Sequence, residues 1–330
     1  MALGMRVTRR EVLVGMAAAA VAAGQQQQPP PTTPPPGPMP PGAVPPDGPR
    51  VARPRGAPKP RTMPAVCLFS QQLIKIEYEA MGMILRDLGF DGCDLAVIPG
   101  GHVPPEKAGS DLMRAIESVA GVGLEVPLLT TAMTNGADPS GRMVLSIAGF
   151  MGIPIFRPGY WRYGNAPDIE GRQLEVQREM MGLASIARAY NVAMAVHNMS
   201  GDNVGASLFE LSSMIRGVDP RWVGYNFDPG YATETAGPQS SITALRLVLP
   251  RLKAVTVKDF TWSKDGGGWK ATPCPLGEGM VDWKAFFAGL AKIRYTGPIT
   301  IEMKYQVKDD LGAIRKDLEF VRKQIAAAWS

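Results

Sequence analysis

The sequence has 330 residues and a mass of 35.4 kDa, which is enough for one large domain or two ordinary ones. Its charge is uneven, because residues 1–62 hold eight basic and two acidic side chains, which leaves 27 basic and 28 acidic ones in 63–330. That near-neutral larger part lacks the basic excess of a nucleic-acid binder, and three cysteines in the chain exclude a disulfide-stapled scaffold.

Residues 1–24 have the pattern of an export signal. A basic stretch ends at Glu11, and an apolar, alanine-rich run of about 13 residues follows over Val12–Gly24. This run is shorter than the about 20 residues of a membrane span, so we expect no stable transmembrane helix. Thr8-Arg9-Arg10-Glu11-Val12-Leu13 resembles a twin-arginine signal, which implies the twin-arginine export machinery as a partner and a periplasmic or secreted bacterial protein.

Residues 25–62 form a second segment of distinct composition. Four glutamines open it, and all 15 prolines of residues 1–62 follow. Such a stretch cannot bury enough apolar surface to fold. We expect a disordered, extended tether, with recognition of its proline-rich runs as the alternative.

From residue 63 to the end, short runs with β-propensity alternate with helical patterns. The final helix is the clearest, with apolar residues at steps of three and four from Leu311 to Trp329. The expected strands are Ala65–Ser70, Gly92–Val97, Val126–Ala132, Ile153–Gly159, Asn191–Asn198, Val223–Gly230, Leu252–Phe260 and Gly297–Met303. Eight strand–helix units predict an α/β protein with a single (β/α)8 TIM barrel over 63–330.

A doubly wound sheet is the alternative fold, and the first turn argues against it. Such sheets usually carry a glycine-rich phosphate loop after the first strand, whereas Ser70-Gln71-Gln72 follows here. In a barrel, functional side chains gather at the carboxyl ends of the strands. The polar residues expected there are Ser70, His102, Thr131, Arg157, His197, Asn198, Asp228, Tyr231, Lys258, Asp259, Glu302 and Lys304.

Four segments carry a resemblance to a known family. They are Leu88–Leu95, Val257–Phe260, Pro275–Trp283 with its Gly-Glu-Gly, and Gly297–Glu302 with its Gly-Pro before a strand that ends in glutamate. Together they resemble the sugar phosphate isomerase/epimerase superfamily of xylose isomerase-like barrels. Pro99-Gly100-Gly101-His102-Val103 is similar to a secreted bacterial branch of it.

The resemblance implies one divalent metal (Mn, Zn, Co, Fe or Mg) held by side chains from the last four barrel strands. Asp228 and Glu302 match two of the ligands, and His197 stands where the fifth strand usually supplies glutamate. The seventh-strand ligand is replaced by Thr256, and a histidine that usually follows the aspartate is Tyr231. We therefore expect a metal site made of His197, Asp228 and Glu302, a donor set that suits transition metals.

The implied chemistry is proton transfer next to a carbonyl group. Glu302 is the expected base, and His197 or Lys258 takes the second proton-transfer role. An ammonium near these ligands, from Lys258 or Lys304, would repel a dication and could stand in for it. The residues expected to bind substrate are His102, Arg157, Tyr231, Trp262 and Lys304.

Each of these residues also has a structural interpretation. A lone strand histidine is often a satisfied core residue, Asp228 before Pro-Gly could build a turn, and Glu302 could be an ion-pair partner of Lys304 or Lys258. The sequence therefore predicts an isomerase or epimerase of a sugar or keto-sugar. The alternatives are a lyase or dehydratase, and a degenerate barrel that binds carbohydrate without turnover.

Overall fold

The computed structural model describes residues 61–330. The expected signal peptide, and the expected linker up to residue 60, lie outside the described residues. At the start of the described part, the guanidinium of Arg61 lies 3.5 Å from Asp91 and 3.2 Å from Glu125. No helix in residues 61–330 is long and apolar enough to cross a membrane.

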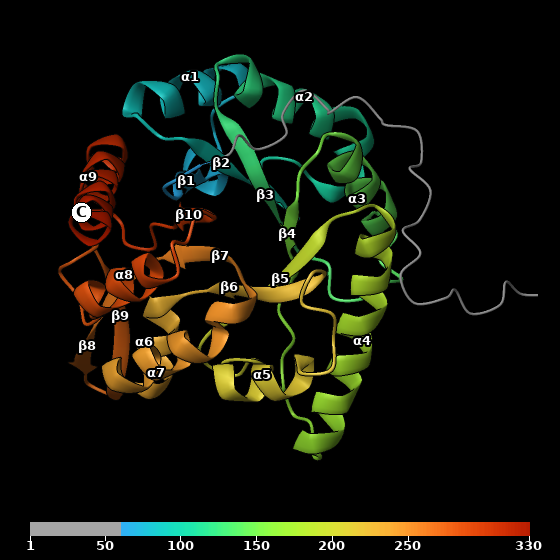
Figure 1. Cartoon of the computed structure of the whole chain (residues 1–330), viewed down its shortest axis with the longest axis vertical. Helices are drawn as coiled ribbons and strands as arrows, with labels where there is room; N and C mark the ends of the chain where they lie inside the picture. Colours follow the sequence, from blue (N-terminus) through green and yellow to red (C-terminus); the bar gives the residue numbers. More distant parts are fainter. Residues whose placement is uncertain (1–60) are drawn as a thin grey trace, which may run out of the picture. The chain divides into compact units, whose positions relative to one another are not determined.

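Eight parallel strands close into a barrel, with the order β1-β10-β7-β6-β5-β4-β3-β2 (Figure 1). This confirms the predicted (β/α)8 fold, and each barrel strand lies within or beside its expected range. The barrel strands are β1 (Ala65–Phe69), β2 (Gly92–Val97), β3 (Glu125–Thr131), β4 (Ile155–Arg157), β5 (Ala193–His197), β6 (Val223–Phe227), β7 (Leu252–Val257) and β10 (Pro298–Ile301).

The helices surround the strands in Figure 1, as the barrel architecture requires. The last helix begins after Asp309, whose side chain accepts a hydrogen bond from the Gly312 N–H at 2.9 Å. The helices are α1 (Tyr78–Leu88), α2 (Ala108–Gly121), α3 (Gly141–Phe150), α4 (Ile169–Ala189), α5 (Leu208–Ile215), α6 (Pro229–Ala236), α7 (Pro238–Val248), α8 (Trp283–Lys292) and α9 (Asp310–Trp329).

The core has two parts. The larger part packs the strands against the surrounding helices. From α9 it takes Ile314, Leu318, Val321 and Ile325, whereas Leu311 at the start of the predicted apolar stripe is 44% exposed. A small separate cluster joins Leu128, Ala195 and Ala254, on β3, β5 and β7, with Ile155 against it. Residues from alternate strands form such a layer inside a barrel. The side chains at the strand ends therefore lie above an apolar layer.

The largest departure from the expected elements follows β7. The expected strand Leu252–Phe260 ends at Val257, and Asp259–Asp265 (β8) and Gly268–Cys274 (β9) form a separate antiparallel hairpin. The carboxylate of Asp259 accepts hydrogen bonds from the N–H groups of Gly277 and Gly279, at 3.0 and 3.2 Å. Asp259 therefore anchors the chain that returns from the hairpin toward α8.

A second departure lies between β6 and β7, where two helices take the place of one. Gly237 separates α6 from α7 with a φ of 81°, a left-handed value that favours glycine, and Pro238 opens the second helix. The short α6 places Asp228 and Tyr231 over the barrel mouth.

Candidate functional site

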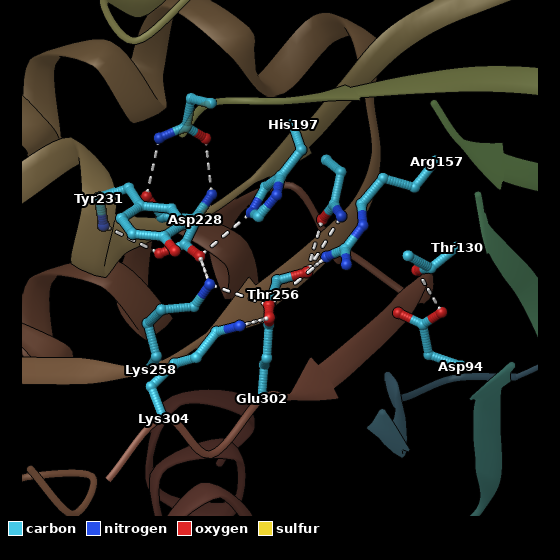
Figure 2. Close-up of polar contacts among 12 residues, drawn as sticks. Asp94, Thr130, Arg157, His197, Asp228, Tyr231, Thr256, Lys258, Glu302 and Lys304 are labelled. Atoms are coloured by element: carbon cyan, nitrogen blue, oxygen red, sulfur yellow. Dashed lines mark hydrogen bonds and ion pairs between the residues drawn. The ribbon is translucent and has the colours of Figure 1, made fainter. Parts of the chain in front are cut away.

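Ionisable side chains from five strand ends meet at the mouth of the barrel. Arg157 ends β4, His197 ends β5, and Asp228, Lys258 and Glu302 follow β6, β7 and β10. All five are buried. Figure 2 shows that they point toward one another from different strands, as the sequence predicts for a barrel.

The position of Asp228 is fixed by its neighbours along and across the chain. It is the N-cap of α6, and its Oδ1 accepts the Tyr231 N–H at 3.0 Å. The side chain of Asn198 accepts from the Asp228 N–H at 2.8 Å and donates to its carbonyl at 3.0 Å. Gly230 allows close approach to β7, because a Cβ there would lie 2.7 Å from the Lys258 carbonyl oxygen. Asp228 Oδ2 is thereby left to face the site.

The ammonium of Lys258 lies between two carboxylates. Its Nζ is 2.8 Å from Asp228 Oδ2, 2.9 Å from Glu302 Oε2, and 3.9 Å from the centre of the Tyr231 ring. Burial by itself would lower the pKa of Lys258, but the two carboxylates outweigh it and raise the pKa. Lys258 is therefore held protonated, which removes it as the second base that the sequence suggested.

Glu302 is surrounded by cations. Besides Lys258, Lys304 Nζ lies 2.6 Å from Oε1 and Arg157 Nη1 lies 3.5 Å from Oε2. A backbone bond from the Glu302 N–H to the Val257 carbonyl, 3.1 Å long, holds it beside β7. Burial opposes ionisation, yet Lys258, Arg157 and Lys304 lower the pKa of Glu302 well below its usual value. The side chain of Lys304 is 44% exposed, so it is the partner of Glu302 that is open to solvent.

His197 connects a tyrosine to the cluster. Its Nε2 lies 3.1 Å from Asp228 Oδ2, and its Nδ1 lies 2.7 Å from the hydroxyl of Tyr160. Burial lowers the pKa of His197 to about 4, so the ring is neutral at physiological pH. An ionised carboxylate only accepts, so Nε2 carries the proton and Nδ1 accepts from Tyr160. His197 therefore reaches the cavity through Tyr160.

The side chains at the mouth do not fit the divalent metal that the family resemblance implies. The Lys258 ammonium lies where Asp228 and Glu302 converge, and Arg157 and Lys304 bring two further positive charges to Glu302. As the side chains of residues 61–330 lie in this structure, no three from His, Cys, Asp or Glu form a group that could hold a metal ion. The expected His197–Asp228–Glu302 site is therefore corrected to an ion-pair cluster centred on Lys258.

A cavity of about 620 Å³ opens beside this cluster. Of the expected substrate-binding residues, Arg157, Tyr231 and Lys304 line it, together with Glu302 and Tyr160. Sugars present hydroxyls and C–H faces, and charged groups beside aromatic rings suit both. A smaller cavity of about 290 Å³ shares Tyr231 and Lys304 with it and also borders Lys258.

Two of the expected substrate-binding residues lie elsewhere. The ring nitrogens of His102 lie 2.9 and 2.8 Å from the carbonyl oxygens of Ser70 and Ile76, so His102 links the loops after β1 and β2. Trp262 is on the β8–β9 hairpin, 39% exposed, and packs edge-on against Phe260. Neither side chain borders the 620 Å³ cavity.

Three buried polar residues below the mouth, Asp94, Thr130 and Asn226, were not predicted from the sequence. Asp94 on β2 accepts a hydrogen bond from the Thr130 hydroxyl at 2.6 Å (Figure 2). Its burial, opposed by Arg157 and Thr130, raises the pKa of Asp94 to about 6. The side-chain nitrogen of Asn226 donates a hydrogen bond to Thr256 Oγ1 at 3.0 Å, so the Thr256 hydroxyl is already engaged within the barrel. An aspartate inside the otherwise apolar Cys93–Val97 was the signal that could have pointed to Asp94.

Comparison with known proteins agrees with this architecture. The family described as Xylose isomerase-like TIM barrel matches residues 84–324. No curated protein gives a significant match. Among solved structures, 3-keto-D-glucoside 4-epimerase from E. coli has a TM-score of 0.63 and 15% identity, covering 79% of this chain and 99% of that one.

Two other structures show the range of the similarity. A xylose isomerase-like TIM barrel protein from Mycobacterium smegmatis, in complex with magnesium, has a TM-score of 0.63 and 18% identity over 82% of this chain and 98% of that one. D-allulose 3-epimerase from Methylomonas sp., in complex with D-allulose, has a TM-score of 0.61 and 15% identity over 82% and 99%. At these identities the likeness establishes the fold.

Proposed function

This chain belongs to the xylose isomerase-like TIM barrel family, and from that premise we propose that it is an isomerase or epimerase of a sugar or keto-sugar. The reaction is proton transfer next to a carbonyl group. The observation that carries the proposal is the cluster of Arg157, Lys258, Glu302 and Lys304 beside a cavity of about 620 Å³. The epimerases among its structural neighbours support this reaction class.

Glu302 is the base in this proposal. Lys258 and Arg157 approach its Oε2, while Oε1 is paired with the half-exposed Lys304. Ion pairs with an exposed partner contribute little, so a substrate hydroxyl can replace Lys304 at Oε1. Loss of that cation, and exclusion of water by the sugar, would make the carboxylate more basic when the substrate is bound.

The positive side chains supply the complementary half of the chemistry. Removal of a proton next to a carbonyl leaves negative charge on the carbonyl oxygen. Cations that already point at that position stabilise the charge without reorganisation. Arg157 and Lys304 both line the cavity and are placed to do so. Tyr160, with its hydroxyl on His197 Nδ1, is the second proton carrier, and His197 positions it.

A second candidate function is carbohydrate binding without turnover, and one observation favours it. The pKa of Glu302 is held well below its usual value, and that of Asp228 is also lowered, because burial is outweighed by the neighbouring cations. Carboxylates held in this way are weak bases in the sugar-free protein. The two functions therefore differ in whether a bound sugar displaces Lys304 from Glu302 and so makes the carboxylate a stronger base.

Solvent deuterium exchange separates them. The full chain is incubated with ketohexoses and keto-glucosides in D2O, and deuterium on carbon is followed by NMR. We expect exchange next to the carbonyl, slowed about 10²–10⁴-fold in Glu302→Gln, the usual contribution of one acid–base group.

Glu319→Gln, exposed on α9, is the matched control and should exchange at the wild-type rate. Binding without any exchange would defeat the isomerase and favour the binding barrel, and loss of water from the sugar would indicate a lyase.

We also propose that the protein is exported by the twin-arginine machinery to the periplasm or beyond. The support is the order of basic stretch, short apolar run and small residues in 1–24. Arg9→Lys together with Arg10→Lys should abolish export in a bacterial host. Unimpaired export of that variant would exclude the twin-arginine route.

A further inference from the structure

We propose that Lys258 is the resident cation of this site: its ammonium occupies the point where Asp228, Glu302 and His197 would hold a divalent ion, and its removal uncovers a latent metal site. The proposal concerns binding, so it stands whether or not a sugar is turned over.

The spacing of the carboxylates suits an ammonium. The distances from Lys258 Nζ to Asp228 Oδ2 and Glu302 Oε2 are 2.8 and 2.9 Å, which are ordinary lengths for charge-assisted hydrogen bonds. Metal–oxygen bonds to Zn²⁺ or Mg²⁺ are shorter, at roughly 2.0–2.2 Å. The separation of the two carboxylates therefore matches N–H···O hydrogen bonds, and both carboxylates would have to move inward to bind a metal.

The remaining wall of the site is also suited to an ammonium. The ring of Tyr231 faces Lys258 Nζ at 3.9 Å from the ring centre (Figure 2). A ring face attracts a cation through its quadrupole but provides no lone pair for coordination. Lys258 can thus direct two N–H groups to carboxylates and its third to the ring, which satisfies the whole ammonium group.

The charges around the cluster disfavour an additional dication. Arg157 and Lys304 already bind Glu302, so three cations face the carboxylates of Asp228 and Glu302. A divalent ion placed beside them would meet uncompensated positive charge in a buried site, where repulsion is weakly screened. The wild-type cluster is therefore complete without a metal.

Without the amine of Lys258, the same residues become a ligand set. Asp228 Oδ2 and Glu302 Oε2 would still face the vacated point. The His197 ring could change tautomer, with Nδ1–H donating to the Tyr160 oxygen that now donates to it at 2.7 Å, and Nε2 would be free to bind. Two carboxylates and one imidazole form a site suited to Mn²⁺ or Zn²⁺.

The test compares Mn²⁺ binding by three untagged full-length proteins: wild type, Lys258→Ala and Lys304→Ala. Lys304→Ala is the matched control, because it removes a cation from the same glutamate but leaves Lys258 in place. Calorimetric titration and metal analysis after dialysis give affinity and stoichiometry. We expect Lys258→Ala to bind about one Mn²⁺ per chain at least about tenfold more tightly than the other two, and its Tm to rise with added Mn²⁺.

Every outcome bears on the proposal. Tight, stoichiometric Mn²⁺ in the wild type that is lost in Glu302→Gln would overturn it, because the metal would then displace Lys258. Equal affinities in the wild type and Lys258→Ala would overturn the latent site. If Lys258→Ala does not fold in metal-free buffer, we expect Mn²⁺ to restore cooperative melting, and failure to restore it would count against the proposal.

Discussion

Two regions next to each other in this barrel each hold a buried carboxylate, and the two carboxylates are stabilised by different kinds of partner. At the mouth, Glu302 is met by the side-chain cations Lys258, Lys304 and Arg157. In the connection from β7 to α8, the carboxylate of Asp259, 2% exposed, accepts from four backbone N–H groups and the Trp283 indole. Lys258 and Asp259 are adjacent in sequence, yet each belongs to a different region.

The difference separates a site for chemistry from a structural anchor. Backbone N–H groups around Asp259 are fixed by the chain itself, and no ligand can replace them. Gly279 is part of this packing, since a Cβ there would lie 2.0 Å from Asp259 Oδ1. Lys304 at the mouth is a long, half-exposed side chain that a substrate can displace. An ion-pair partner that a substrate can displace is therefore the feature that distinguishes Glu302 from Asp259 and indicates a functional role.

The largest effect is expected at the anchor. Asp259→Ala leaves several buried donors without an acceptor, each at a cost of about 1–3 kcal/mol, so the free energy of unfolding should fall by at least about 4 kcal/mol. Urea unfolding of the full chain measures it. Asp87→Ala, which removes an exposed partner of Arg86, is the control and should change stability by less than about 0.5 kcal/mol. Similar curves for the two variants would refute the anchoring role.

Asp94 adds a third way to bury a carboxylate, because it accepts a hydrogen bond from the Thr130 hydroxyl and the charge of Arg157 offsets its burial only in part. Its pKa is raised to about 6 from 3.8, chiefly by burial. Between those values the unfolded chain releases a proton that the folded chain keeps, so stability is lost as the pH rises through this window. Relative to wild type, Asp94→Asn should gain about 3 kcal/mol in the free energy of unfolding from about pH 4 to about pH 7. A pH-independent difference would show that Asp94 titrates normally.

A smaller effect is expected for the proton carrier at the mouth. Tyr160→Phe removes the hydroxyl bound to His197 Nδ1, and deuterium exchange into a bound ketose should slow by about 10–100-fold. The Kd of the sugar should change less, because the aromatic ring remains. Tyr163→Phe is matched to it, since that hydroxyl binds Glu210 away from the cavity. Equal slowing in both variants would assign the effect to structure.

The smallest effect tests the exchangeable partner directly. Lys304→Ala removes a half-exposed ion-pair partner of Glu302, so the free energy of unfolding should fall by no more than about 1 kcal/mol. Thermal melts of the full chain provide the measurement. A loss as large as that of Asp259→Ala would mean that the Lys304 pair is a fixed part of the structure, and the contrast between the two regions would disappear.

The alternation of strands and helices was enough to predict the barrel and the residues at its mouth. Arg157, Asp228, Lys258 and Glu302 all lie where strand ends were expected, because parallel strands of a barrel open onto one face. The β8–β9 hairpin was not anticipated, because Phe260 and its neighbours continue the β-propensity of β7 and local pattern does not show where a strand leaves the sheet.

The sequence by itself determined the fold and the set of charged groups at the mouth, since both follow from local periodicity and position in the chain. Only the tertiary structure decided which charges meet. Lys258 and Glu302 are 44 residues apart, and His197 and Asp228 are 31 apart, so their contacts depend on strand register and side-chain direction. An ammonium placed 2.8 and 2.9 Å from two carboxylates turns the expected metal site into an ion-pair cluster, because both cations would need the same lone pairs.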